Sequence, residues 1–284
     1  MAWNTKYWDV VDQLYWSPKY LGLRSINKRH WEIEDGRVSV PSELVNKSGP
    51  LYTRRLRIAD LIQDLHGKEE ILNDVFDLTF AIAPDAVISN LFVKPHGFSD
   101  AGPFESLGRE IGNRYGWGVS ENVTQPDGVF VSDRTIAGVE IKLRSSTWPE
   151  QIAKYVAVMV SEEIEFHRRD QLGLLFIVPE TAVNGHWQKC KLDGAVIDAS
   201  FLEILNPKKL PKRIRELFSD ERDIVADVLN RLQLSVVSWS AFREQIVGMQ
   251  DRLSVADQGE QTLYRLLDGF RAQLDAHRNT GIKR

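Results

Sequence analysis

The chain has 284 residues, 43% of them hydrophobic, which is enough for one large domain or two small domains with a buried core. Its formal net charge of −4 excludes a polycation that binds nucleic acid by overall charge, so such binding would need local basic patches. Since it has no apolar stretch near the roughly 18 to 20 residues that cross a bilayer, no signal-peptide core and one cysteine, we expect a cytoplasmic protein without membrane contact.

Residues 1–95 are predicted to form an accessory domain of helices with a β-hairpin. Apolar residues recur at helical spacing over 3–14 and again over 56–65. Between them, residues 31–40 alternate apolar and polar side chains around Asp35-Gly36, a dipeptide that suits a tight hairpin turn. The turn-forming residues 95–103 then indicate a linker to the next domain.

Residues 103–205 are predicted to form an α/β domain that could carry catalysis. The expected elements are a helix over 104–115, strands at 128–131 and 136–142, a helix with Pro149 in its first turn, a strand at 172–178 and a further strand at 195–197. The continuous apolar run of 172–178 is typical of a strand buried on both faces. This order of elements predicts an α/β sandwich around a mixed central sheet.

Residues 206–284 are expected to be a C-terminal helical region. Apolar residues recur at helical spacing over 224–232, and Leu263, Leu266, Leu267, Phe270 and Leu274 form a second apolar stripe. Such stripes usually pack in a core or an interface, so the second stripe could serve a homodimer.

Three residues with complementary chemistry are predicted to meet at one edge of the sheet. Asp127 stands before the first strand, and Glu140 and Lys142 lie at the end of the second. Side chains at positions i and i+2 of a strand share a face, so Glu140 and Lys142 project together while Ile141 points into the opposite layer. If the two strands are adjacent, the Asp127 carboxylate lies close to that pair.

Two carboxylates and an ammonium group suit metal-dependent phosphodiester hydrolysis. The side chains of Asp127 and Glu140 and the backbone carbonyl of Ile141 can hold Mg²⁺, with Mn²⁺ as a substitute, because these ions prefer oxygen ligands. The metal would polarise the phosphate and lower the pKa of an attacking water. Lys142 could position that water and neutralise charge that develops on phosphorus.

The spacing Pro126-Asp127, twelve residues, Glu140-Ile141-Lys142 resembles the motif of the PD-(D/E)xK nuclease superfamily. Gln151 and Tyr155, one helical turn apart, resemble the Gln-x-x-x-Tyr element of RecB-like members, whose polar residues contact substrate or support the metal ligands. The resemblance covers about residues 104 to 200. It implies a restriction-endonuclease-like fold in which Asp127, Glu140, Lys142, Gln151 and Tyr155 form the catalytic site.

The superfamily often carries an acidic residue on the helix before the first motif strand. Glu105 and Glu110 are the two candidates in this chain, and the separation of Glu105 from Asp127 is like that in resolvase-type relatives. The resemblance therefore implies that Glu105 is a further catalytic residue and metal ligand, with Glu110 as the open alternative.

The resemblance implies a metal-dependent nuclease that hydrolyses DNA, and the compact chain without a phosphate-binding loop favours an endonuclease of bacterial defence or restriction type. A DNA exonuclease or a repair or recombination nuclease is the nearest enzymatic alternative. From a different class, the chain could be a catalytically inactive, nuclease-like module for DNA binding or assembly. The intact Asp127, Glu140 and Lys142 argue against that alternative. A homodimer would suit double-strand cleavage, which needs two cuts.

DNA contacts are expected from a basic cluster that follows the last predicted strand. Its members are Lys208, Lys209, Lys212, Arg213 and Arg215. Such a cluster could hold phosphates over Asp127 and Glu140, although an ordinary solvated face has the same composition. Residues 24–29 and 54–57 hold smaller basic groups that are the alternative clamps.

Overall fold

The computed structural model describes residues 69–108, 111–117, 124–143, 147–195, 197–254, 256–277 and 280–282, together with three short N-terminal strands. These strands are β1 (Glu32–Glu34), β2 (Arg37–Ser39) and β3 (Leu56–Arg57), and each pairs antiparallel with the next. The pairing of Glu34 with Arg37 confirms the predicted hairpin. The helix predicted from residue 56 is wrong at its start, because Leu56 and Arg57 pair with β2. The helix predicted over 3–14 lies outside the described residues.

The chain divides into two compact units, residues 1–74 with 254–278 and residues 75–253 with 279–284. In the first unit, α13 (Gln258–Ala276) confirms the predicted helix at the second apolar stripe. The Asp257 side chain caps it by accepting a 2.8 Å hydrogen bond from the Glu260 N–H, and Leu267, Phe270 and Leu274 are buried. The homodimer that we suggested for this stripe stays a prediction. In the described part of the chain, no helix has the length and apolar character to cross a membrane.

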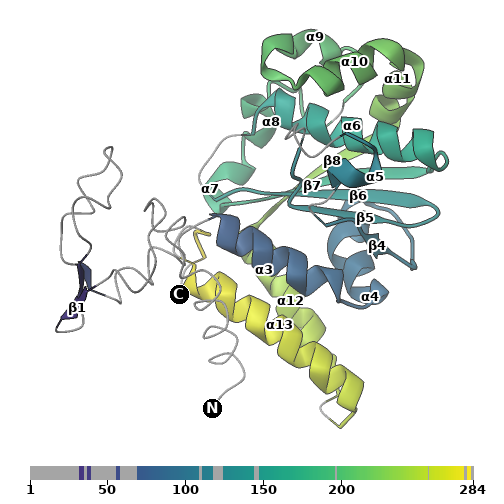
Figure 1. The fold of residues 1–284 in the computed structure, drawn as a ribbon. Helices are drawn as coiled ribbons and strands as arrows, with labels where there is room; N and C mark the ends of the chain where they lie inside the picture. Colours follow the sequence, from purple (N-terminus) through teal and green to yellow (C-terminus); the bar gives the residue numbers. More distant parts are fainter. Residues whose placement is uncertain are drawn as a thin grey trace. The chain divides into compact units, whose positions relative to one another are not determined.

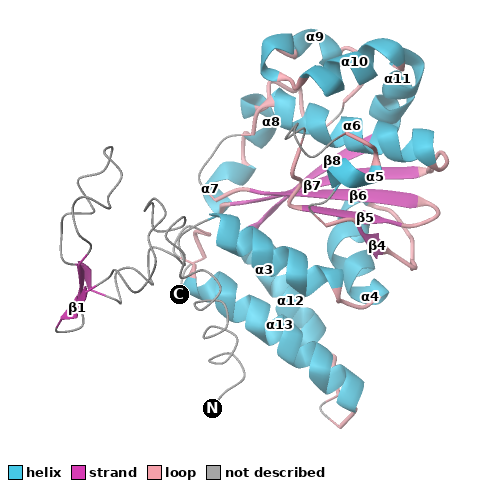
Figure 2. Ribbon diagram, in the orientation of Figure 1, coloured by secondary structure: helices cyan, strands magenta, loops and turns pink. Residues whose placement is uncertain are grey.

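The second unit is built on a five-stranded mixed sheet (Figure 2). Its strands are β4 (Glu105–Ser106), β5 (Gly128–Val131), β6 (Thr135–Ile141), β7 (Gln171–Val178) and β8 (Leu232–Ser238), and they lie in this order. The first three strands pair antiparallel and the last three pair parallel. The predicted α/β class and mixed sheet are confirmed, and the strands predicted at 128–131, 136–142 and 172–178 match β5, β6 and β7.

Helices cover both faces of this sheet (Figure 1). On one face lie α6 (Pro149–Glu165), α10 (Lys212–Asp220) and α11 (Arg222–Arg231). On the other lie α4 (Asp85–Ile88), η4 (Ser89–Val93), α12 (Trp239–Gln250) and the part of α3 (Glu69–Ala81) from residue 75 onwards. Short helices complete the unit: η5 (Lys94–His96), α5 (Ile111–Arg114), α7 (Glu180–Val183), α8 (His186–Lys189), α9 (Phe201–Ile204) and η6 (Pro207–Lys209).

Two apolar layers hold the sheet between these helices. Against α6, the core contains alternate residues of the parallel strands, such as Leu174 and Phe176, packed with Val156 of the helix. On the other face, Phe92 stacks on Phe130 with ring centroids 4.8 Å apart and also contacts Phe242. Full burial of each such side chain stabilises the fold by roughly 1.5 to 3 kcal/mol.

Several predicted elements are wrong, and the reason in each case is tertiary pairing. The predicted helix over 104–115 is replaced by β4 and the short α5, because Glu105 and Ser106 pair with β5. Strand β8 interrupts the predicted C-terminal helical region and pairs with β7 along its whole length. The strand predicted at 195–197 is absent from its described residues, with Ala195 in a turn and Ile197 outside any strand.

The predicted linker over 95–103 is also wrong, since it lies inside the second unit. The ring of His96 packs so closely on β7 that a Cβ at Gly173 would lie 2.4 Å from the ring. His96 Nδ1 also lies 2.9 Å from the Ser235 hydroxyl on β8. This turn-rich segment therefore packs on the sheet and does not separate two domains, so the predicted boundaries at 95 and 103 do not coincide with the compact units.

Candidate active site

The candidate active site lies where β5 and β6 meet at one end of the sheet. The antiparallel register places Gly128 opposite Val139, so Asp127, the residue before β5, stands opposite Glu140. A carboxylate oxygen of Asp127 accepts a 2.7 Å hydrogen bond from the backbone N–H of Ile141. The structure thus brings together the two carboxylates that the sequence predicted at this edge.

Glu140 and Lys142 form a close ion pair at the end of β6. Nζ of Lys142 lies 2.5 Å from Oε1 of Glu140. Both residues and Asp127 are largely covered, with 5 to 8% of their surfaces exposed. Charged side chains are rarely this buried unless they are paired or bind a ligand. Ile141 is fully buried, and strand alternation turns its side chain to the opposite layer.

Gln151 connects this pair to the first turn of α6. Its Nε2 donates a 2.9 Å hydrogen bond to Oε1 of Glu140, while its Oε1 accepts a 3.2 Å bond from the backbone N–H of Trp148. Because one planar amide makes both bonds, the start of the helix fixes the orientation of Gln151. Gln151 in turn fixes the carboxylate of Glu140.

The hydroxyl of Tyr155 bridges the two motif strands. It accepts a 3.1 Å hydrogen bond from the backbone N–H of Asp127 and lies within hydrogen-bonding distance of two acceptors, Oε2 of Glu140 at 2.8 Å and the backbone carbonyl of Val139. Burial, followed by the negative charges of Glu140 and Asp127, raises the pKa of Tyr155 far above its ordinary value. The phenol therefore keeps its proton at neutral pH and acts as a donor to one of the two acceptors.

Gly138 makes room for the Tyr155 ring, a relation that the sequence analysis missed. A Cβ at Gly138 would lie 2.8 Å from Cδ1 of Tyr155 and 3.2 Å from a methyl carbon of Leu174. The distance to the tyrosine ring is too short for a Cβ, so the position requires glycine while the ring occupies this place. An isolated glycine inside a predicted strand is the signal that could have revealed this close approach.

The atoms of the site that could bind a metal are mainly oxygens, the ligand type that Mg²⁺ prefers. The N–H and C=O of one strand residue point to the same side, so the Ile141 carbonyl faces the side of Asp127, as its N–H does. A carboxylate offers about four acceptor positions, and the contacts described for Glu140 are with three donors. Within the described residues, no group of three His, Cys, Asp or Glu side chains could hold a metal. Two carboxylates, a carbonyl and several waters are nevertheless a donor set that suits Mg²⁺.

Glu105 does not join this site. It lies on β4 opposite Val131, which is four residues along β5 from Asp127, or about 13 Å at the rise of an extended strand. Its side chain is 60% exposed and pairs with Arg114 at 3.0 Å. The expectation that Glu105 is an early helical residue beside the metal is therefore wrong, because pairing with β5 places it at the other end of the sheet. The alternative, Glu110, lies outside the described residues.

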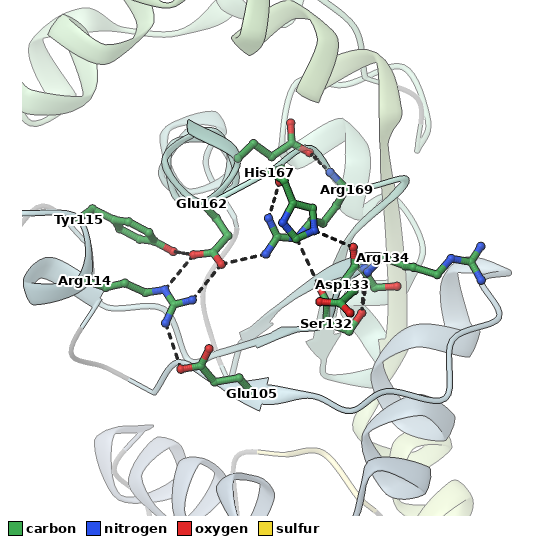
Figure 3. A network of polar contacts seen from close by, with 11 residues as sticks. Glu105, Arg114, Tyr115, Ser132, Asp133, Arg134, Glu162, His167 and Arg169 are labelled. Carbon is green, nitrogen blue, oxygen red and sulfur yellow. Dashed lines mark hydrogen bonds and ion pairs between the residues drawn. The ribbon is translucent and has the colours of Figure 1, made fainter. Parts of the chain in front are cut away.

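A buried charge cluster that the sequence did not predict lies toward the other end of α6 (Figure 3). The carboxylate of Glu162, which has no exposed surface, accepts bonds of 2.9 and 3.0 Å from Arg114, 2.7 Å from Tyr115 and 3.3 Å from Arg169. Hydrogen bonding to Glu162 raises the pKa of Arg114. Burial and then Glu162 raise the pKa of Tyr115. Arg169 also donates to the backbone carbonyl of Ser132. The cluster therefore fastens α6 to the turn between β5 and β6.

The predicted basic cluster is exposed but divided along α6. Lys208 and Lys209 lie in η6, and Lys212, Arg213 and Arg215 lie in α10. Nζ of Lys209 lies 4.8 Å from the centroid of the Trp148 ring. The N–H of Asn206 donates a 3.2 Å bond to Glu150 in the first turn of α6. The η6 end of the cluster is therefore beside the helix turn that carries Gln151.

The α10 part of the cluster has different neighbours. Arg213 lines a cavity together with Tyr115 and Ile164, near the C-terminal end of α6. Lys212 pairs with Glu216 at 3.4 Å, so it has an acidic neighbour on the same helix. Of the five predicted DNA contacts, Lys208 and Lys209 are thus the best placed for the candidate site.

The fold and this site define an α/β protein with two carboxylates and a lysine gathered at one end of a five-stranded mixed sheet. Comparison of the chain with models of protein families, with curated proteins and with solved structures gave no match. The function is therefore inferred from the fold and from the chemistry of the site.

Proposed function

We propose that the chain is a metal-dependent nuclease of the PD-(D/E)xK type that hydrolyses DNA phosphodiester bonds on a restriction-endonuclease-like fold. The observation that carries this proposal is the convergence of Asp127, Glu140 and Lys142, with Gln151 and Tyr155 both bonded to Glu140. The form that we favour is an endonuclease of bacterial defence or restriction type. A DNA exonuclease or a repair or recombination nuclease is the alternative with the same chemistry.

The residues of the site have separate roles in this proposal. Bound to Asp127, Glu140 and the Ile141 carbonyl, Mg²⁺ or its substitute Mn²⁺ would polarise the phosphate and lower the pKa of the attacking water. The ammonium group of Lys142 can hold that water and offset the negative charge that develops on phosphorus. Gln151 and Tyr155 are positioning residues, because their hydrogen bonds keep the Glu140 carboxylate in one orientation.

A nuclease-like module that binds DNA or assembles without cutting is the second candidate function. The observation in its favour is the ion pair of Lys142 and Glu140. The two charged groups lie 2.5 Å apart, and both residues are almost fully buried. A buried pair of this kind also occurs as a purely structural element of a protein core.

A cleavage assay separates these functions. The pure protein is incubated with supercoiled, linear and single-stranded DNA in Mg²⁺, in Mn²⁺ and in EDTA. We expect cleavage with either metal and none in EDTA. Internal cuts in closed circular DNA would identify an endonuclease, and loss that begins only at ends would identify an exonuclease. Intact DNA under every metal condition would contradict the proposed nuclease and favour the inactive module.

The divided basic cluster gives a prediction about DNA binding. Replacing Lys208 and Lys209 together with alanine should weaken binding to every DNA sequence and flatten the logarithmic salt dependence of affinity by roughly 1.5 to 2, since two phosphate contacts are lost. The matched control replaces Arg213 and Arg215, which removes the same charge from α10 and should change the salt slope by much less. Binding measured over a series of salt concentrations tests both variants. Equal changes of the salt slope in both variants would show that the η6 and α10 parts of the cluster do not differ in DNA binding.

A further inference from the structure

Trp148 is an exposed aromatic residue whose backbone is hydrogen-bonded to Gln151 of the candidate active site. Trp148 is the N-cap residue of α6 and is 51% exposed. Single exposed apolar residues are common on proteins, so exposure by itself does not indicate function. The position and the contacts of this ring are what distinguish it.

The backbone of Trp148 is held by the same residue that holds Glu140. Its N–H donates to Oε1 of Gln151, and its carbonyl accepts a 2.9 Å bond from the Gln151 N–H. The other end of the Gln151 amide donates to Glu140. Two consecutive hydrogen bonds therefore join the Trp148 backbone to the Glu140 carboxylate. They fix the position of the Trp148 backbone relative to Glu140.

A cation lies over the Trp148 ring. Nζ of Lys209 is 4.8 Å from the ring centroid, and Lys208 and Lys209 are both exposed. The cation and the indole attract each other, which limits the motion of both side chains. The result is an exposed aromatic ring with positive charge beside it, on a residue that Gln151 links to Glu140.

This combination has a definite chemical preference. Proteins that bind single strands stack bases on aromatic side chains and hold the backbone with positive charge. In an intact duplex the faces of the bases are already stacked on each other, so a protein ring can reach them only after a base is unpaired or turned out. An exposed tryptophan beside a phosphodiesterase site therefore favours unpaired nucleotides.

We propose that Trp148 is a base-stacking platform that selects single-stranded DNA, or an unpaired segment of a larger DNA, at the site of Glu140. This inference rests on the proposed nuclease function and narrows its substrate class. The base stacks on the indole, Lys209 contacts a neighbouring phosphate, and the next phosphodiester bond is presented to Asp127 and Glu140. Trp148 is a residue that contacts substrate and determines specificity.

Phe166 is a matched control on the same helix. It is 53% exposed, and the guanidinium carbon of Arg114 lies 4.5 Å from its ring centroid. Phe166 therefore has nearly the same exposed fraction as Trp148 and, like Trp148, has a cation over its ring. It follows the C-terminal end of α6, about 27 Å from Trp148 at the rise of an α-helix, and lies near the Glu162 cluster.

The test measures binding of a fluorescently labelled oligo-dT strand and of a labelled blunt-ended duplex of two complementary strands in EDTA, which prevents metal-dependent cleavage. Trp148→Ala should weaken binding to the single strand about tenfold or more, as expected for loss of one stacked base. Binding to the duplex and the salt slope for the single strand should remain as in the wild type, because no charge is removed. Trp148→Phe should restore most of the affinity, and Phe166→Ala should have no effect.

The same preparations are assayed for cleavage with Mg²⁺, so that the two proposals fail separately. Unchanged single-strand affinity of Trp148→Ala, or an equal loss for strand and duplex, overturns the stacking platform even if the wild type cleaves DNA. A selective loss of single-strand binding without cleavage by the wild type supports the platform and contradicts the nuclease. A wild type that binds neither DNA in EDTA and cleaves neither with Mg²⁺ overturns both. Thermal unfolding of each variant shows that its fold is intact.

Discussion

Glu140→Gln and Asp127→Asn are each expected to lower the rate of Mg²⁺-dependent DNA cleavage by about a thousandfold or more, which corresponds to a loss of about 4 kcal/mol of transition-state stabilisation. Both replacements keep the size of the side chain, and Asp127→Asn keeps an oxygen that can accept the bond from Ile141. Glu140→Gln keeps one acceptor oxygen, either for Tyr155 or for Gln151 and Lys142. What each removes is one negative charge from the proposed metal site. The rate is measured with the DNA that the wild type cleaves, at saturating Mg²⁺.

The control for this prediction is Glu105→Gln. This replacement also neutralises a carboxylate, but the Glu105 side chain is exposed and lies at the other end of the sheet, so the cleavage rate should stay close to that of the wild type. A large loss with Glu105→Gln would restore its role as a metal ligand. Near-normal cleavage by both Glu140→Gln and Asp127→Asn would rule out the proposed catalytic site.

Glu162→Ala is expected to lower the free energy of unfolding by about 3 to 5 kcal/mol, the cost typical of removing one partner of a buried ion pair. The fully buried carboxylate accepts bonds from Arg114, Tyr115 and Arg169. The variant leaves a buried cation and a buried phenol with fewer partners. Urea-induced unfolding of wild type and variant measures the difference.

Glu165 supplies the matched control for this stability prediction. It is an exposed glutamate on the same helix, so Glu165→Ala should change the free energy of unfolding by less than about 0.5 kcal/mol. If Glu162→Ala unfolds at the same urea concentration as Glu165→Ala, the Glu162 cluster does not fasten α6 to the sheet.

The sequence was sufficient to predict the centre of the site because that centre depends on local geometry. Alternation along a strand places Glu140 beside Lys142, and the short turn after β5 brings Asp127 opposite Glu140. The apolar run of β7 likewise identifies a strand buried on both faces without knowledge of its partners. The Gln-x-x-x-Tyr resemblance placed Gln151 and Tyr155 on α6, and the structure adds the particular atoms of Glu140 that they contact.

The parts that the sequence did not predict depend on partners far away in the chain. The apolar residues around Glu105 recur at helical spacing and therefore predicted a helix. Pairing with Val131 of β5 makes Glu105 part of a strand instead. Strand β8 lies between helices in the sequence. It pairs parallel with β7, and more than fifty residues separate the two strands in the chain. Glu162 looked like an ordinary helical glutamate, because its role requires Arg114 and Arg169 from other segments.

The contact between Gly138 and Tyr155 has an evolutionary consequence. A side chain at position 138 and a tyrosine ring at position 155 exclude each other, since a Cβ would lie 2.8 Å from the ring. In any set of descendants of this chain, the two positions should therefore change together, with glycine retained wherever the tyrosine is retained. A descendant that acquires alanine or serine at position 138 should have lost the aromatic ring as well. With that ring it would lose the hydroxyl that bridges Asp127 and Glu140. A change at both positions would therefore mark the descendants in which the site no longer functions.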